Sequence, residues 1–197
     1  MEITVDSIRD QIPYYLTQEQ KVGLVKALKD FPENTQYYLN GYQDELLQGD
    51  GWTKLQIVLF ETGEKVSSQG IVLSNTCDVA LENKRTLPVK ITFAPIIPLA
   101  AYIKLLKTNG INSTDLHNKL DAIRKQKVST IFYLPAGGAL TEEHIALFDD
   151  LHTMPANVFG AEKAKSKLFT LSLVGFYLFL LKLSVHFCRF HENVARA

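Results

Sequence analysis

Short apolar runs separated by turn sequences, between residues 48 and 97, constrain the fold of this chain more than any other feature. Glycine, asparagine and charged residues, which favour reversals of the backbone, gather in the turns at 48–51, 62–65 and 82–85. The runs between the turns alternate in polarity or are continuously apolar, as strands are. The strands that this pattern predicts are 52–61, 70–74 and 87–96.

The rest of the chain adds strands and helices to this predicted sheet. Pro98 at the start of one run, and Ser113 or Thr114 at the start of the next, predict two helices that interrupt the strands. A capping-box pattern at Thr17 and Gln20 predicts another helix. Further strands are predicted at 128–134, 144–152 and 168–173, and helices at 6–11, 17–31, 98–107, 113–127 and 175–196.

These elements predict one α+β domain. Its centre is a small antiparallel, partly open barrel of about five or six strands, with helices before it, inserted in it and after it. At 197 residues, the chain is long enough to bury a core without disulfides or metals. The predicted organisation is a helical N-terminal part at 1–47, barrel strands at 48–97 and 128–173, a helical insertion at 98–127, and a C-terminal helix at 174–197.

The charge balance and the cysteines limit the class of protein. Lysine plus arginine and aspartate plus glutamate each number 21, so any nucleic-acid surface must be a local patch. The start of the chain lacks the basic and apolar regions of a signal peptide, and Cys77 and Cys188 lie far apart, which favours a reducing cytoplasm. The apolar run at 168–181 is shorter than the roughly 20 residues that cross a bilayer, so we expect no membrane association.

A cluster of small polar residues follows the predicted strand at 70–74. Loops at the ends of barrel strands often carry function, so this cluster is a candidate ligand-binding or nucleophile site. The alternative is structural: Asn75 and Asp78 would close a turn by bonding nearby backbone groups, while Cys77 would pack as a small apolar residue. The residues of the cluster are Ser74, Asn75, Thr76, Cys77 and Asp78.

A catalytic version of this site would use Cys77 as nucleophile, with Asp78 and one histidine. A histidine must lie close to the thiol to lower its pKa, and the sequence does not choose the partner. The histidines are His117, His144, His152, His186 and His191.

The sequence predicts no metal site and no cofactor. His186, Cys188 and His191 are the densest group of possible metal ligands. On a helix, however, Cys188 and His191 would lie about 60° apart while His186 points to the other side, and the chain has no CxxC pair.

A stripe of basic residues is the second candidate binding surface. Its members recur at helical spacing in the predicted C-terminal helix, so they share one face. Arginine suits bidentate pairing with phosphate and lysine attracts it as a point charge, although a solvated helix face has the same pattern. The stripe consists of Lys182, His186, Arg189 and Arg196.

The order of motifs between residues 49 and 96 resembles the start of a PemK/MazF-like protein, the SH3-like barrel of bacterial toxin–antitoxin pairs. The shared features are a Gly-Asp before the first strand, a Gly-Glu in the next loop, an apolar strand ending in Ser-Asn, and a later strand ending in Pro-Ile. In this chain they are Gly49-Asp50, Gly63-Glu64, Ser74-Asn75 and Pro95-Ile96, and the segment 149–155 resembles a later strand of the family.

Two features of the family members that cut RNA are missing. They carry an arginine before the second strand and a serine or threonine after the Pro-Ile, whereas this chain has Gln69-Gly70 and Ile97-Pro98 there. Without a cation to stabilise a developing phosphorane charge, phosphoryl transfer loses one of its largest electrostatic contributions. The resemblance therefore implies a barrel that binds rather than cleaves.

We expect a cytoplasmic protein of a bacterial toxin–antitoxin or phage-defence system that binds RNA, DNA or a protein partner. The alternative is an enzyme, either a nuclease or a cysteine-dependent hydrolase, that uses Cys77 with Asp78 and a histidine. A homodimer is left open.

Overall fold

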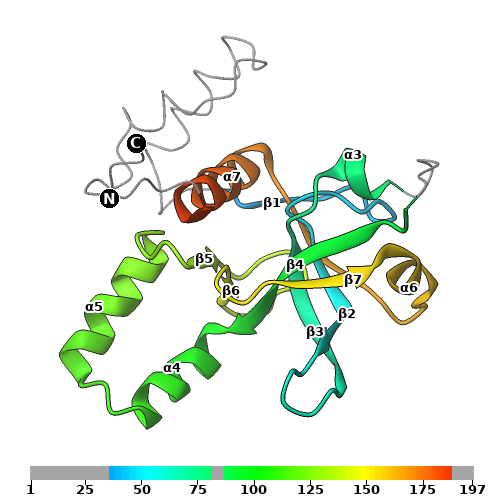
Figure 1. The fold of residues 1–197 in the computed structure, drawn as a ribbon. Coiled ribbons are helices and arrows are strands. Elements are labelled where there is room, and N and C mark those ends of the chain that lie inside the picture. Colours follow the sequence, from blue (N-terminus) through cyan, green and yellow to red (C-terminus); the bar gives the residue numbers. More distant parts are fainter. Residues whose placement is uncertain (1–35, 81–86, 188–197) are drawn as a thin grey trace, which may run out of the picture.

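The computed structural model describes residues 36–80 and 87–187, which form a curled antiparallel sheet with helices around it (Figure 1). The α+β class and the partly open small barrel predicted from the sequence are confirmed. The helices predicted at 6–11 and 17–31, and the part of the C-terminal helix within 188–197, lie outside the described residues.

The sheet has eight strands among the described residues, in the order β1-β8-β2-β3-β4-β6-β5, and β7 pairs with β4. All of these pairings are antiparallel. The strands are β1 (Tyr38–Leu39), β2 (Gly51–Val58), β3 (Lys65–Val72), β4 (Lys90–Pro98), β5 (Ile131–Leu134), β6 (His144–Leu147), β7 (His152–Pro155) and β8 (Lys167–Leu171).

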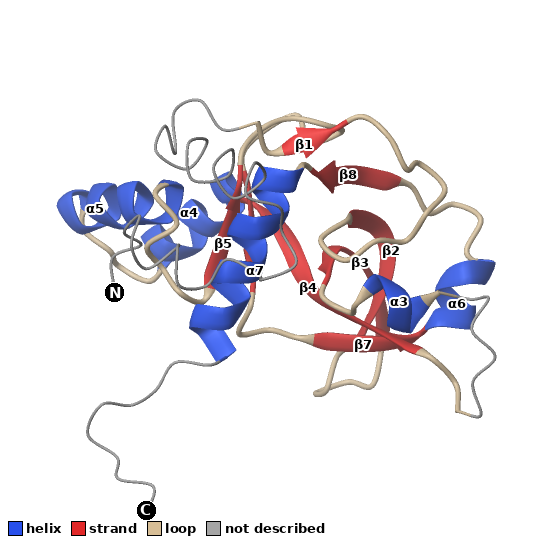
Figure 2. Cartoon of the chain, turned by 90° about the horizontal axis from the view of Figure 1, so that it is seen from above, coloured by secondary structure: helices blue, strands red, loops and turns tan. Residues whose placement is uncertain are grey.

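Strand β4 joins two parts of the sheet because it changes partner along its length. One edge of β4 pairs with β3, while the other pairs with β7 at 90–93 and with β6 at 96–98. The first part therefore contains β2, β3 and β7, with β8 and β1 beyond β2, and the second contains β5 and β6. In Figure 2, β5 lies toward one end of β4, and β2, β3 and β7 lie toward the other.

The helices lie around the sheet. The single-turn helix α3 (Thr76–Val79) follows β3, and α6 (Ala156–Ala161) follows β7. Helices α4 (Leu99–Thr108) and α5 (Ser113–Arg124) form an arm that leaves the sheet between β4 and β5, as the predicted insertion does (Figure 1). Helix α7 (Leu173–Phe187) follows β8.

Helix α7 covers the part of the sheet that contains β5 and β6. Phe179 packs edge-on against Phe132 at 5.5 Å between ring centroids, and Phe132 stacks on Phe148 at 6.0 Å. Leu178 is buried in the same cluster. Within residues 36–80 and 87–187, no helix is long and apolar enough to cross a membrane.

A β-bulge in β2 places Trp52 and Leu55 in the same core. Residues three apart on a regular strand point to opposite faces, but the register shifts between these two, and Lys54 has a positive φ of 61°. Both side chains are buried with Phe93. A Cβ on Gly70 would lie 2.7 Å from Phe93 and 2.8 Å from Leu55, so only glycine lets β3 approach this core so closely.

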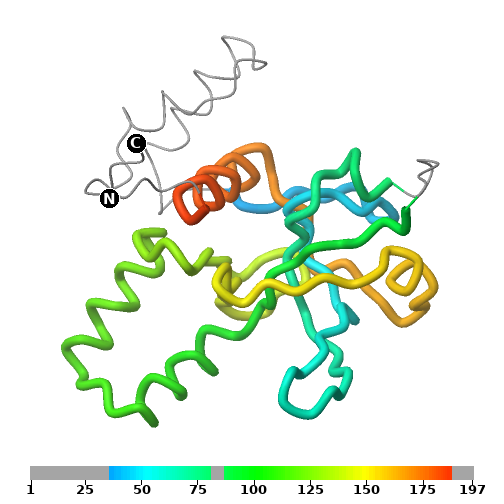
Figure 3. Tube along the Cα trace, in the orientation of Figure 1, coloured from blue at the N-terminus to red at the C-terminus, as the bar shows by residue number. Residues whose placement is uncertain are grey.

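Strand β3 begins at Lys65, earlier than the predicted start at residue 70. Residues 65–69 carry no apolar pattern because they extend a solvent-exposed hairpin, in which Lys65 pairs with Val58. Figure 3 shows this hairpin projecting from the body of the molecule.

The single strand predicted at 144–152 is wrong, because residues 148–151 turn between β6 and β7. The turn is fixed by hydrogen bonds from Phe148 N to Thr130 O at 2.8 Å and from Asp150 N to Leu147 O at 3.3 Å. Strand β1 and helices α3 and α6 were not predicted.

Candidate functional site

The polar cluster after β3 lies where the sequence predicted, and its first residue ties strand ends together. Ser74 Oγ accepts a hydrogen bond from Thr92 N at 2.8 Å. Leu73 N donates to Thr92 O at 2.8 Å, so both backbone groups of Thr92 are bonded by this segment of the chain. Ser74 therefore joins the end of β3 to β4.

Asn75 and Thr76 also bond backbone groups. Asn75 Oδ1 accepts from Cys77 N at 2.9 Å and so caps α3, the role that the structural alternative gave it. Thr76 Oγ1 accepts from Gln48 N at 3.0 Å and connects α3 to the turn before β2. These two side chains hold the loop in place.

Cys77 and Asp78 are both exposed on α3. The expectation that Cys77 packs as a small apolar residue is therefore wrong. A helix of one turn has room for one inward-facing residue, and in α3 that residue is Val79, which is 1% exposed.

The histidines that the sequence offered as partners of Cys77 lie in several places. Helix α5, with exposed His117, is on the opposite side of the molecule from α3 in Figures 1 and 2. His144 Nδ1 lies 2.8 Å from Glu142 O, and His152 Nε2 lies 2.9 Å from Asp150 Oδ1. The ring of His186 is 4.6 Å from that of Phe187, and His191 lies outside the described residues.

The predicted basic stripe does not form a continuous exposed surface, because Lys182 is buried, with 1% of its surface exposed. Its Nζ donates to Gln126 O at 2.9 Å and to Val128 O, and burial lowers its pKa to about 8. Helical spacing showed which residues share a face, but not that this face meets the loop after α5. Arg189 and Arg196 lie outside the described residues.

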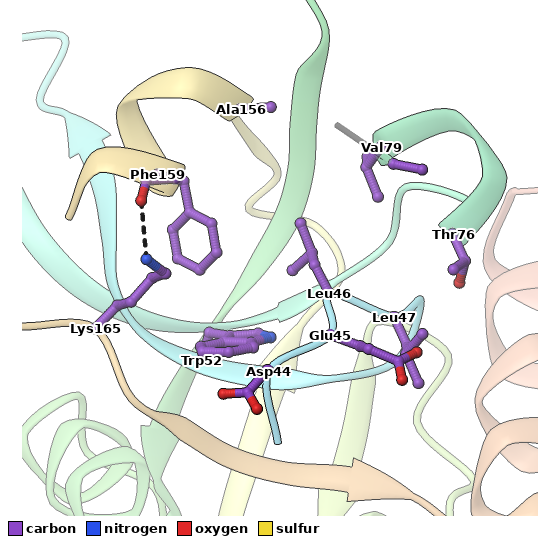
Figure 4. A pocket seen from close by; sticks show the side chains of 12 residues that line it. Asp44, Glu45, Leu46, Leu47, Trp52, Thr76, Val79, Ala156, Phe159 and Lys165 are labelled. Atoms are coloured by element: carbon purple, nitrogen blue, oxygen red, sulfur yellow. Dashed lines mark hydrogen bonds between the residues drawn. The ribbon is translucent and has the colours of Figure 1, made fainter. Parts of the chain in front are cut away.

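A cavity of about 450 Å³ lies beside α3, between α6, β2 and the irregular segment 44–47 (Figure 4). Thr76, Val79 and Ala80 form the wall contributed by α3 and its end. The rest of the lining consists of Asp44, Glu45, Leu46, Leu47, Trp52, Ala156, Phe159, Gly160 and Lys165.

Two aromatic rings form the floor of this cavity. Trp52 and Phe159 meet edge to face, with centroids 5.5 Å apart and planes at 87°. Only 5% of Trp52 and 3% of Phe159 are exposed, so the rings are fixed by the core beneath them. Such pre-formed apolar concavities with a few polar groups are the usual form of ligand sites.

A buried ion pair between Lys167 and Asp50 lies next to the Trp52 ring. Lys167 Nζ lies 2.7 Å from Asp50 Oδ2 and 5.1 Å from the centroid of the Trp52 ring. Burial raises the pKa of the Asp50 carboxyl, although the hydrogen bond from Lys167 opposes the shift. Lys167 also donates to Tyr42 O and to Thr170 Oγ1, at 3.2 Å for the latter.

Two buried polar atoms next to the cavity have no hydrogen-bond partner among the described residues. They are Trp52 Nε1 and Asp50 Oδ1. Leaving a buried donor or acceptor unpaired costs about 1–3 kcal/mol, so most native structures avoid it.

The rim of the cavity carries both signs of charge. Asp44 and Glu45 are exposed carboxylates, and neither is in an ion pair with a described residue. Lys165 is on the other side, where its Nζ donates to Gly160 O at 3.0 Å and Glu162 O at 2.9 Å (Figure 4). The lysine is thus anchored to backbone, while the two carboxylates face solvent.

Sequence reasoning singled out the α3 side of the cavity but missed Trp52, Phe159 and the acidic rim. The one available signal was the single tryptophan beside Gly49-Asp50-Gly51, at the start of a strand. Across 36–80 and 87–187, no group of three or more histidine, cysteine, aspartate or glutamate residues could hold a metal ion.

Comparison with protein-family models and with curated proteins found no match to this chain.

Proposed function

We propose that this chain is a binding protein that holds a protein partner at the cavity between β2, α3 and α6, without nuclease turnover. The setting is the one that its resemblance to PemK/MazF-like proteins implies, a bacterial toxin–antitoxin or phage-defence system. The cavity carries the proposal: at about 450 Å³, with an aromatic floor, it is in the size range of pockets that bury ligand groups.

The charges near the cavity favour a protein over a nucleic acid. The exposed carboxylates of Asp44 and Glu45 would repel phosphates, which need neutralisation by lysine or arginine. On α7, the ammonium of Lys182 is occupied by two backbone carbonyls and does not reach solvent. An apolar and aromatic surface with an acidic rim is, in contrast, suited to a protein segment.

The arrangement of the polar cluster favours binding over catalysis. Ser74, Asn75 and Thr76 each bond a backbone group and so have a structural role. Cys77 and Asp78 are exposed but are absent from the cavity lining, so a molecule held on the aromatic floor would not lie against them.

Photocrosslinking at the rim tests this proposal. Gly160→p-benzoylphenylalanine, on exposed α6, places the crosslinker at the cavity and keeps both rim carboxylates, and Thr108→p-benzoylphenylalanine, on exposed α4, is the matched control. In cells that naturally contain the protein, position 160 should crosslink to one protein, and position 108 should not. Ala80→Phe, which narrows the cavity, should abolish that crosslink, and the purified partner should bind with a Kd of about 1 μM or tighter.

Two results would overturn the proposal. Equal crosslinking from both positions, or crosslinking unaffected by Ala80→Phe, would show that the cavity is not the contact site. Crosslinking of position 160 to RNA or DNA, or cleavage of RNA by the purified protein, would replace the protein partner with a nucleic acid.

A further inference from the structure

The unpaired indole nitrogen of Trp52 is the starting point for defining the ligand. Trp52 lines the cavity and is 95% buried, since its exposed fraction is 5%, yet no described residue supplies an acceptor for Nε1. In Figure 4 the nitrogen lies at the end of the indole that faces Leu46 and Glu45. A ligand that brings a carbonyl oxygen to this end of the cavity would supply the missing acceptor.

The acidic rim belongs to the same segment. Asp44 and Glu45 precede Leu46, and neither carboxylate pairs with a described cation. The one lysine among the described residues of the lining, Lys165, is held on the opposite side by two backbone carbonyls. Among the described residues, the lining therefore has two carboxylates and one anchored ammonium, an excess of one negative charge.

We propose that the cavity binds an arginine residue of the partner: its guanidinium meets Asp44 and Glu45, and its main-chain carbonyl accepts from Trp52 Nε1. This inference deepens the proposed function, on which it rests. Arginine suits the site better than lysine because its planar guanidinium pairs bidentately with carboxylates and stacks on aromatic rings. Its aliphatic stem would cover Leu46 and the edge of the aromatic floor.

Segment 44–47 must adjust for the carbonyl to reach the nitrogen, because Nε1 is covered in this structure. The segment has no regular secondary structure, and Glu45 N donates to Tyr42 O at 3.3 Å. At its other end, Leu47 N donates to Asp50 Oδ2 at 2.9 Å and Leu47 O accepts from Asp50 N at 3.1 Å. No backbone hydrogen bond is described for Leu46, which lies between these two anchors, so the inference requires Leu46 to shift.

The single tryptophan provides a direct readout, since the protein has one indole N–H and therefore one indole cross-peak in a ¹H–¹⁵N spectrum. The probe is Nα-acetyl-arginine-N-methylamide, and the control is the same compound with citrulline, the uncharged isostere of arginine. The arginine probe should move the indole proton downfield and saturate with a Kd of about 1 mM. The citrulline probe should bind at least about tenfold more weakly, which is a difference of about 1.4 kcal/mol.

Matched variants separate charge from fold. Asp44→Asn with Glu45→Gln should weaken the arginine probe about tenfold and leave the citrulline probe unchanged, because only the guanidinium loses its partners. Glu64→Gln, in the turn between β2 and β3, removes a carboxylate far from the cavity and should change neither. The full spectrum of each variant reports whether the fold is intact.

The outcomes distinguish this inference from the proposed function. No saturable indole shift, or equal binding of both probes, overturns the arginine site even if position 160 crosslinks to a partner protein. A selective shift with the arginine probe supports the arginine site. If crosslinking then finds no partner protein, the proposed function fails while the arginine site stands.

Discussion

Asp50 and Lys167 form an ion pair that water barely reaches, with side chains 1% and 3% exposed. Removing one partner leaves the other charge buried without compensation, so Lys167→Met should lower the free energy of unfolding by about 3–5 kcal/mol. Adding Asp50→Asn should restore part of that loss. Urea unfolding followed by the fluorescence of Trp52 measures both, and effects that add within about 0.5 kcal/mol would contradict a coupled pair.

Lys182 predicts a pH dependence. Burial lowers its pKa from 10.5 to about 8 in the folded protein, so between these values the unfolded chain binds more protons than the folded chain. Stability from this group therefore rises with pH across that window.

Lys182→Met should remove this rise. Between pH 7.5 and pH 9.5, the wild-type protein should gain about 1–2 kcal/mol relative to the variant, given about 1.4 kcal/mol per pKa unit. Parallel curves for the two proteins, from urea unfolding at each pH, would show that Lys182 titrates normally.

The same residue shows why the basic stripe could not be assigned from the sequence. A spacing of four and three residues defines a helix face, but which face meets the core depends on residues far away in the sequence. For Lys182 these are Gln126 and Val128, whose backbone carbonyls accept hydrogen bonds from its Nζ. Trp52 is a similar case, because its place in the cavity depends on a bulge and on Phe159, more than 100 residues later.

At the scale of elements, α3 depends on its neighbours for support, since a single turn has too few hydrogen bonds of its own. Ser74→Ala and Asn75→Ala should each lower the free energy of unfolding by about 1 kcal/mol, because each removes an acceptor for a backbone N–H. Cys77→Ser, on the exposed side, should change it by less than about 0.5 kcal/mol. A reversed order in thermal unfolding would mean that Cys77 has a structural role.

Elements with a clear hydrophobic periodicity or a continuous apolar run could be predicted from the sequence, whereas several of the shortest elements could not. Strands β2 and β4 and the helices of the arm follow from alternation, apolar runs and capping residues. The N-cap of α5 is Asn112, however, and not Ser113 or Thr114 as predicted. The elements that were not predicted have two residues in β1, four in α3 and six in α6, which is too short for the alternation of a strand or the 3.6-residue repeat of a helix to be recognised.

At the scale of the whole molecule, the sequence predicted an antiparallel sheet but not its strand order. Strand β2 lies between β3, its neighbour in sequence, and β8, the last strand. The first pairing follows from a short turn, whereas the second joins Gly51 to Phe169 and depends on the closure of the entire sheet. Local patterns carry no information about such a distant pairing.

The structure also predicts that the molecule opens unevenly. Helix α4 buries only Leu99 and α5 buries only Ile123, whereas α7 buries Gly175, Tyr177, Leu178, Phe179 and Lys182. Parts of a protein with few buried contacts open locally at a lower free energy than its core. The arm should therefore unfold while the sheet and α7 remain intact.

Native-state hydrogen exchange tests this. Amides of α4 and α5 should exchange through openings at least about 1–2 kcal/mol less costly than those of β3 and β4, which reach the global free energy of unfolding. Arg124→Gln removes the bidentate pair with Glu143, at 2.8 Å for both contacts, and should speed exchange in the arm alone. If the amides of α5 and β4 exchange through openings of equal free energy, in both the wild-type protein and Arg124→Gln, the arm and the sheet unfold as a single cooperative unit. That result would contradict the prediction.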